Sequence, residues 1–118
     1  MSVAKITEFF SAWAMDNAAE RGHAIRASFA TTGSYDDPRT EMLKGPDAVT
    51  DYVGMFTEAA PGAVAEVVKI ESRAGVTRAT IAFKMPNGME QTGQYFIEQD
   101  ENGLITRMIG FVGTGAPE

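Results

Sequence analysis

The clearest candidate for chemistry in this sequence is Asp37, a carboxylate placed immediately before Pro38. A proline favours extended backbone in the residue before it, so Asp37 is expected at the end of an extended segment. Tyr35 and Asp37 are two residues apart and share one face of that segment, whereas Asp36 faces the other way. Asp37 is therefore either a cavity carboxylate, acting as a general base or hydrogen-bond acceptor, or a residue that caps backbone N–H groups of the following loop.

Three further residues could belong to a site or simply to the fold. Trp13 lies on an apolar stripe of helical spacing, which is typical of a core and also suits the wall of a buried cavity. Tyr95 shares a strand face with Gly93, which leaves room beside its ring for a ligand, or its hydroxyl has a local partner. The single histidine, His23, lies about 200° around a helix from Ile25, so we expect it at the surface.

Composition excludes several kinds of site. The 118 residues include no cysteine and one histidine, so we expect no disulfide, no metal centre and no cofactor. A net charge of −6 argues against a nucleic-acid partner, because binding to phosphates requires a clustered basic surface. The apolar runs are too short to cross a membrane, and the first residues lack the pattern of a signal peptide. We therefore expect one cytoplasmic domain over residues 1–118.

The first half of the chain has the spacing of helices. Apolar residues at positions i, i+3, i+4 and i+7 predict a first helix over residues 3–17 and a third helix that begins at Pro46 and ends before Pro61. A shorter helix is expected between them, over residues 18–30. The segment 31–37 lacks the helical period and predicts a short strand.

The second half alternates between apolar and polar residues and predicts a four-stranded antiparallel meander. Asn87-Gly88 and Asn102-Gly103 are strong signals for hairpin turns within it. Because the helices have apolar faces, they must pack on one face of the sheet, which gives an α+β fold. A curved antiparallel sheet around three helices leaves a cone that can hold a ligand. The expected core includes Phe10, Trp13, Phe29, Val53, Phe56, Phe83 and Ile97.

Four short stretches, spread over nearly the whole chain, carry a further signal. They are Phe9-Phe10-Ser11-Ala12-Trp13, Tyr35-Asp36-Asp37-Pro38, Gly45-Pro46-Asp47-Ala48-Val49 and Asp100-Glu101-Asn102-Gly103-Leu104-Ile105. In order and spacing the chain resembles the nuclear transport factor two-like superfamily, in particular its SnoaL-like and ketosteroid isomerase-like proteins. This resemblance implies a cystatin-like α+β barrel, which that superfamily uses for isomerases, dehydratases, cyclases, hydrolases and binding proteins.

The resemblance also implies roles for individual residues. In ketosteroid isomerase a carboxylate moves a proton next to a carbonyl group, while two neutral donors hold the resulting oxyanion. Asp37 matches the position of that base, Trp13 that of the oxyanion tyrosine and Tyr95 that of the protonated acid. An indole N–H is a weaker acid than a phenol, so this site departs from a steroid isomerase. The substrate-binding wall is expected to include Tyr35, Met42, Phe56 and Phe83.

Two functions remain open from the sequence. The first is an isomerase, dehydratase or hydrolase that acts on a small apolar carbonyl compound with Asp37 as its general base. The second is a non-catalytic ligand-binding or dimeric interaction domain of the same fold, which the replacement of both acidic donors favours.

The sheet also predicts an assembly. Helices on one face leave the other face bare, and a large exposed apolar patch usually marks an interface. We therefore expect a two-fold homodimer packed through the sheets. The bare face is expected to carry either Leu104, Met108 and Val112 or Ile105, Ile109 and Phe111.

Overall fold

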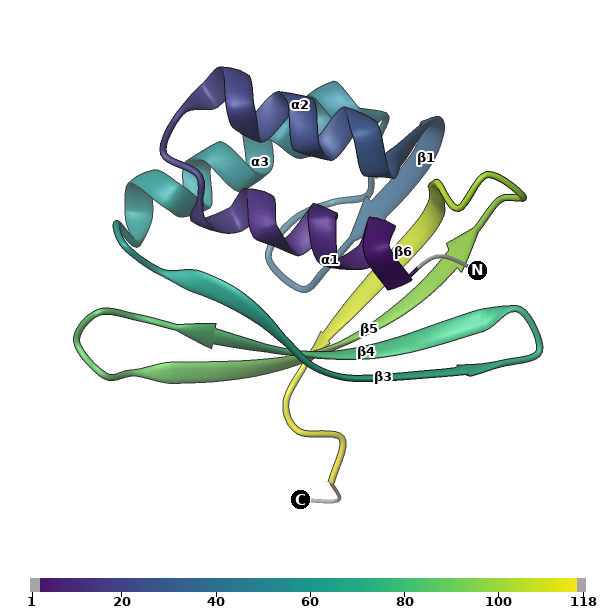
Figure 1. Cartoon of the computed structure of the whole chain (residues 1–118). Coiled ribbons are helices and arrows are strands. Elements are labelled where there is room, and N and C mark those ends of the chain that lie inside the picture. Colours follow the sequence, from purple (N-terminus) through teal and green to yellow (C-terminus); the bar gives the residue numbers. More distant parts are fainter. Residues whose placement is uncertain (1–2, 117–118) are drawn as a thin grey trace.

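In the computed structural model, which describes residues 3–116, three helices cover the concave face of one curved sheet (Figure 1). The three helices are α1 (Val3–Ser11), α2 (Ala18–Ser28) and α3 (Pro46–Ala59), and a short 3₁₀ helix, η1 (Ala12–Ala14), follows α1. The strands are β1 (Phe29–Asp36), β2 (Leu43–Lys44), β3 (Val64–Arg73), β4 (Val76–Lys84), β5 (Glu90–Gln99) and β6 (Ile105–Val112). This is the α+β cone that the sequence predicts.

The six strands form one sheet in the order β2-β1-β6-β5-β4-β3. Strands β3 to β6 are the predicted antiparallel meander, and Figure 1 shows β3 and β4 bent beneath α1 and α3. The β1 strand, whose direction and neighbour the sequence did not predict, runs parallel to β6. Because β1 joins the free edge of a strand far along the chain, no hairpin forces it to run antiparallel. The short strand β2, which the sequence did not predict, pairs with the other edge of β1.

The first helix is shorter than the predicted range of residues 3–17. It ends at Ser11, and the chain tightens into η1 around Trp13. The buried side chain of Arg21 then donates from Nε and Nη2 to the carbonyl oxygen of Met15, at 3.2 and 3.0 Å. The Arg21 side chain therefore supplies the hydrogen-bond donors for the Met15 carbonyl oxygen that a further helical turn would otherwise supply.

The core lies between the helices and the concave face of the sheet. Six of the predicted core residues are buried, namely Phe10, Trp13, Phe29, Val53, Phe83 and Ile97. The seventh, Phe56, is half-buried because it borders a pocket. His23 is exposed on α2, as expected.

Neither of the two sets predicted for the outer face of the sheet lies there intact. A bulge in the β5–β6 pairing places Thr106 as an extra residue in β6, so Ile105 and Met108 are both fully buried. The outer face instead exposes Phe96 and Phe111, which pack edge to face with ring centroids 5.7 Å apart.

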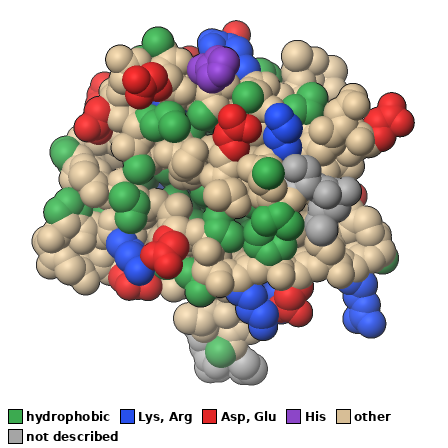
Figure 2. All heavy atoms as spheres, viewed as in Figure 1, with side chains coloured by type: hydrophobic (Ala, Val, Ile, Leu, Met, Phe, Trp, Pro, Cys, Tyr) green, Lys and Arg blue, Asp and Glu red, His purple; other side chains and the backbone are tan. Residues whose placement is uncertain are grey.

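The surface has no dominant basic region on the side that Figure 2 shows. Lys and Arg side chains are interspersed there with Asp and Glu side chains. No helix within residues 3–116 is long and apolar enough to cross a membrane. The same part of the chain brings no three metal-ligating His, Asp or Glu side chains together.

Candidate functional site

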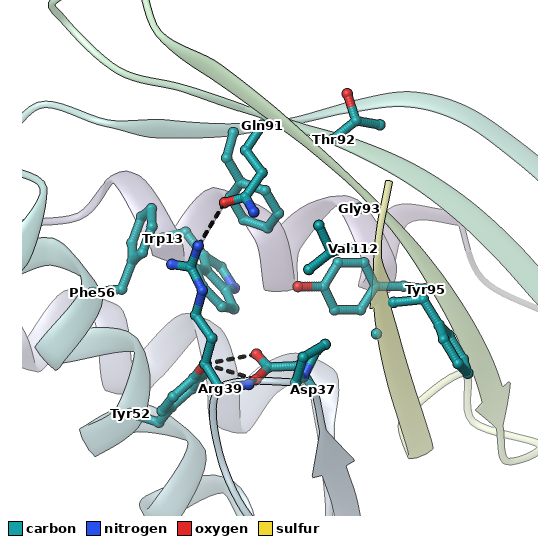
Figure 3. Close-up of a pocket in the computed structure, with 14 residues that line it drawn as sticks. Trp13, Asp37, Arg39, Tyr52, Phe56, Gln91, Thr92, Gly93, Tyr95 and Val112 are labelled. Carbon is teal, nitrogen blue, oxygen red and sulfur yellow. Dashed lines mark hydrogen bonds between the residues drawn. The ribbon is translucent and has the colours of Figure 1, made fainter. Parts of the chain in front are cut away.

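A pocket of about 50 Å³ lies between η1, α3 and strands β4 to β6, at the end of β1 (Figure 3). Aromatic side chains from the helices and the sheet form most of its wall. Asp37 is the one carboxylate among the described residues that line it. The aromatic residues that line it are Trp13, Tyr52, Phe56, Phe83, Tyr95 and Phe111.

The structure brings most of the candidate residues to this pocket. Its lining includes Trp13, Asp37, Tyr95, Phe56 and Phe83. Tyr35 is fully buried behind the pocket, and its hydroxyl reaches two of the lining residues. Met42 does not line the pocket and is 54% exposed, because pairing of the next residue, Leu43, with Tyr35 turns this end of the loop outward.

Asp37 is held by hydrogen bonds from three residues. Tyr35 Oη donates to its Oδ2 at 2.7 Å, and Tyr52 Oη donates to Oδ2 and Oδ1 at 2.7 and 2.9 Å. The backbone N–H of Arg39 donates to Oδ1 at 2.8 Å. The same carboxylate therefore caps the loop and lines the pocket, and its role as a general base stays a prediction.

The hydroxyl of Tyr95 is less firmly engaged. It lies 3.3 Å from Tyr35 Oη, which is longer than the usual 2.7–2.8 Å of an O–H···O bond. Tyr35 has one hydroxyl hydrogen, which it donates to Asp37, so Tyr95 must be the donor in this contact. In Figure 3 the Tyr95 hydroxyl points into the pocket, where a ligand oxygen could take its hydrogen at small cost.

The three tyrosines stay protonated over the range in which proteins normally work. Burial raises the pKa of Tyr35 well above its ordinary value, and the neighbouring Tyr95 and Asp37 raise it further. Burial is also the main cause that raises the pKa of Tyr52 and of Tyr95, with Asp37 adding to both. All three hydroxyls are therefore donors rather than phenolates.

Trp13 supplies an unused donor. Its Nε1 is buried and has no hydrogen-bond partner, and no other buried side-chain nitrogen or oxygen within residues 3–116 shares that state. Leaving a buried donor unpaired costs about 1–3 kcal/mol, so such groups call for an explanation. Figure 3 shows the indole nitrogen on the side of the ring that faces the Tyr95 hydroxyl. A ligand oxygen between the two groups would accept from both.

Two glycines make room for the Tyr95 ring. Gly110 lies opposite Tyr95 in the β5–β6 ladder, and a Cβ there would lie 2.6 Å from the ring. At Gly93 the corresponding distance to the same ring is 3.2 Å. The sequence indicated the space at Gly93, whereas the role of Gly110 depends on the strand register.

Three pocket residues whose side chains form hydrogen bonds at the site were not singled out from the sequence. Tyr52 lies on the apolar stripe of α3, where a tyrosine needs a partner for its hydroxyl, and that need is the signal that could have found it. No sequence pattern indicated a role for Arg39 or Gln91, because Arg39 lies in an irregular loop and Gln91 near the start of a strand. They meet at the pocket, where Arg39 Nη2 donates to Gln91 Oε1 at 2.9 Å.

No family model matches this sequence, and no curated protein is similar to it in sequence. Solved structures do match the fold. A protein of the SnoaL-like family from Agrobacterium tumefaciens strain C58 aligns with a TM-score of 0.84 at 18% identity, over 95% of this chain and 97% of that one. A protein with a ketosteroid isomerase-like fold from Catenulispora acidiphila, in complex with trimethylamine, aligns with a TM-score of 0.70 at 15% identity, over 93% and 85%.

A third structure, a nuclear transport factor two-like protein from Exiguobacterium sp. 255-15, aligns with a TM-score of 0.71 at 14% identity, over 93% of this chain and 98% of that one. These alignments extend over nearly the whole chain. The chain therefore has the cone-shaped fold of the nuclear transport factor two-like, SnoaL-like and ketosteroid isomerase-like proteins. Identity at this level defines the fold alone.

Proposed function

We propose that the protein binds a small carbonyl compound in the pocket and moves a proton at the carbon beside the carbonyl group. The observation that carries this proposal is the buried, unpartnered Nε1–H of Trp13, in the same pocket as a carboxylate. The carbonyl oxygen accepts hydrogen bonds from Trp13 Nε1 and Tyr95 Oη. Asp37 then lies on the remaining polar side of the pocket as the proton acceptor.

The proposed step conserves atoms and charge. A C–H bond next to the carbonyl breaks, Asp37 takes the proton, and the electron pair moves onto the carbonyl oxygen to give an enolate. The two neutral donors hold that enolate. Where the substrate has a C=C bond one carbon further on, the negative charge extends over it, and returning the proton to its far carbon completes an isomerisation. The Tyr52 hydroxyl spans both Asp37 oxygens, so a small rotation of this hydroxyl frees one lone pair for the proton.

The size of the pocket restricts the ligand. A dry cavity of about 150 Å³ is known to hold one benzene molecule. This pocket has about a third of that volume, so its enclosed part accepts only the carbonyl end of a ligand, and the rest of the ligand must extend through the mouth. A compact carbonyl compound fits this space better than a molecule with several fused rings.

Deuterium exchange tests the proton transfer without knowledge of the natural substrate. In D₂O the wild type should accelerate exchange at the central carbon of 2,4-pentanedione above the rate in the same buffer without protein. Asp37→Asn should remove that acceleration and leave the dissociation constant within about threefold. Asp36→Asn is the matched control, because the neighbouring carboxylate is not part of the pocket lining. Exchange by Asp37→Asn at the wild-type rate refutes the role of the base.

A second candidate is a binding protein without catalysis, and the aromatic wall favours it. Six aromatic residues around one carboxylate suit a small alkylammonium ion, which binds to aromatic faces and to a negative charge. The Catenulispora protein of the same fold was solved with trimethylamine. Calorimetric titration with trimethylammonium chloride separates the two candidates. Binding of this cation without binding or exchange of 2,4-pentanedione favours the second one.

We also infer a two-fold homodimer packed through the outer faces of the sheets. The support is the exposed aromatic pair of Phe96 and Phe111, which are 39% and 56% exposed on that face. Light scattering at micromolar concentration should give the mass of two chains, and Phe96→Glu should reduce it to that of one. A wild-type mass of one chain contradicts the dimer.

A further inference from the structure

We propose that the ligand is an anion, a short oxo acid whose carboxylate binds Arg39 at the mouth of the pocket while its keto oxygen binds Trp13 inside. This inference rests on the proposed carbonyl site and adds the charge of the ligand and the direction in which it binds. Its basis is that donors with no partner or only a neutral partner lie both at the mouth and in the interior of the pocket.

The guanidinium of Arg39 is the charged group at the mouth. Arg39 lies in the exposed loop after β1, and Figure 3 shows its side chain crossing the pocket toward Gln91 on β5. The hydrogen bond between them, Nη2 to Oε1 at 2.9 Å, joins the cation to a neutral amide. Within residues 3–116 the Arg39 guanidinium forms no salt bridge, although six other salt bridges are present there. The cation therefore lacks a carboxylate partner.

The nearby Asp37 is not the carboxylate partner of the Arg39 guanidinium. Its oxygens accept from the hydroxyls of Tyr35 and Tyr52 and from the backbone N–H of Arg39, and not from the Arg39 guanidinium. The positive charge of Arg39 is nevertheless felt inside the pocket, since it lowers the pKa of Tyr52 and of Tyr95 against the larger raising effect of burial. An incoming anion would meet this field before it reached the interior.

The mouth can hold a carboxylate with good geometry. A guanidinium presents five N–H donors in a planar fork that matches the two oxygens of a carboxylate. A ligand carboxylate would replace Gln91 Oε1 as the acceptor for Arg39, and the amide of Gln91 could then donate to the same group. Hydrogen bonds between a guanidinium and a carboxylate are stronger than the present bond to a neutral amide.

The two sets of donors define the ligand class. Arg39 and Gln91 lie at the mouth, while Trp13 Nε1 and Tyr95 Oη lie in the aromatic interior. A ligand that satisfies both sets carries a carboxylate at one end and a carbonyl oxygen a few atoms away. The small volume of about 50 Å³ limits the chain between and beyond them to a few carbons. A neutral ketone would satisfy only the inner donors, and Arg39 would repel an alkylammonium ion.

Two nearly isosteric probes test this inference, because acetoacetate has a carboxylate oxygen where 2,4-pentanedione has a methyl group. Calorimetry on the wild type should show about tenfold tighter binding of acetoacetate, the value of one hydrogen-bonded charge pair at an open mouth. Arg39→Gln should bring the two affinities within about twofold of each other. Arg73→Gln removes the same charge at the far end of β3, away from the pocket lining, and should keep the wild-type ratio. The ratio should also shrink when salt is raised, because the pair is accessible to solvent.

Each outcome of this comparison decides between the proposals. Equal affinities of the wild type for the two probes would contradict the anionic ligand. So would a preference for acetoacetate that Arg39→Gln retains. Neither result would contradict the carbonyl site. Binding of neither probe overturns the carbonyl site, and the inference fails with it. Tighter binding of trimethylammonium than of either probe overturns both in favour of a cation site.

Discussion

Raising the pH above 10 should destabilise the folded protein steeply, because two buried tyrosines keep their protons only while the chain is folded. Burial is the first cause that raises the pKa of Tyr35 and of Tyr95 above the ordinary value of 10.0. Below pH 10 the folded and unfolded states both hold these protons, and stability does not depend on them. Above pH 10 the unfolded chain releases the protons and the folded chain does not, so the free energy of unfolding falls as the pH rises.

The size of the effect follows from the ordinary tyrosine value in the unfolded chain. At pH 11 ionisation of one tyrosine stabilises the unfolded state by about 1.4 kcal/mol. Each further pH unit adds about 1.4 kcal/mol until the pH reaches the pKa of that tyrosine in the folded protein. Tyr35 and Tyr95 are almost completely buried, with 0% and 4% exposure, so both should contribute nearly in full. Burial also raises the pKa of Tyr52, which is only half-buried and should add a smaller amount. We expect the free energy of unfolding to fall by about 3–4 kcal/mol between pH 9 and pH 11.

Urea unfolding followed by circular dichroism at half-unit steps from pH 8.5 to 11.5 measures this slope. Tyr95→Phe keeps the ring and removes one titrating group, so it should reduce the loss between pH 9 and pH 11 by about 1.4 kcal/mol. Lysine deprotonation affects wild type and variant alike and cancels in this comparison. A wild-type stability that stays flat to pH 11, or a slope that Tyr95→Phe leaves unchanged, would refute the reasoning.

Three further predictions concern the elements that shape the pocket. Gly110→Ala should cost about 1–3 kcal/mol in urea unfolding and weaken binding of 2,4-pentanedione, because the added Cβ would lie 2.6 Å from the Tyr95 ring. Trp13→Phe should weaken the same binding about tenfold in calorimetry through loss of the inner donor. Arg21→Met should lower the free energy of unfolding by about 1–3 kcal/mol, because it leaves the Met15 carbonyl oxygen without its donor. A variant whose free energy of unfolding or affinity for 2,4-pentanedione stays at the wild-type value would contradict the corresponding prediction.

The sequence was most informative where a regular period determined which way side chains point. Alternation along a strand placed Tyr35 and Asp37 on one face, and their side chains are joined by a hydrogen bond in the structure. The helical stripe likewise directed Trp13 toward the sheet, even though the helix gives way to η1 before that residue. Both predictions depend on local geometry, which the sequence determines over a few residues.

Residues in irregular backbone were beyond this reasoning. Arg39 reaches Gln91 across the pocket because the loop after β1 folds back over the opening of the pocket. An irregular loop has no periodic sequence pattern from which this conformation could be predicted. The same loop leaves Met42 exposed rather than beside the pocket. The bulge at Thr106 similarly changed which side chains of β6 face outward, because one extra residue reverses the alternation.

The most direct test of the carbonyl site uses the single tryptophan of the chain as its reporter. A ¹⁵N-labelled protein should give one indole N–H resonance, from Trp13, and this donor has no partner in the unliganded pocket. Saturating 2,4-pentanedione should move this resonance downfield and slow its exchange with water, because a carbonyl oxygen then accepts the hydrogen bond. An indole resonance that does not respond to the ligand, while backbone resonances elsewhere do, would contradict the account.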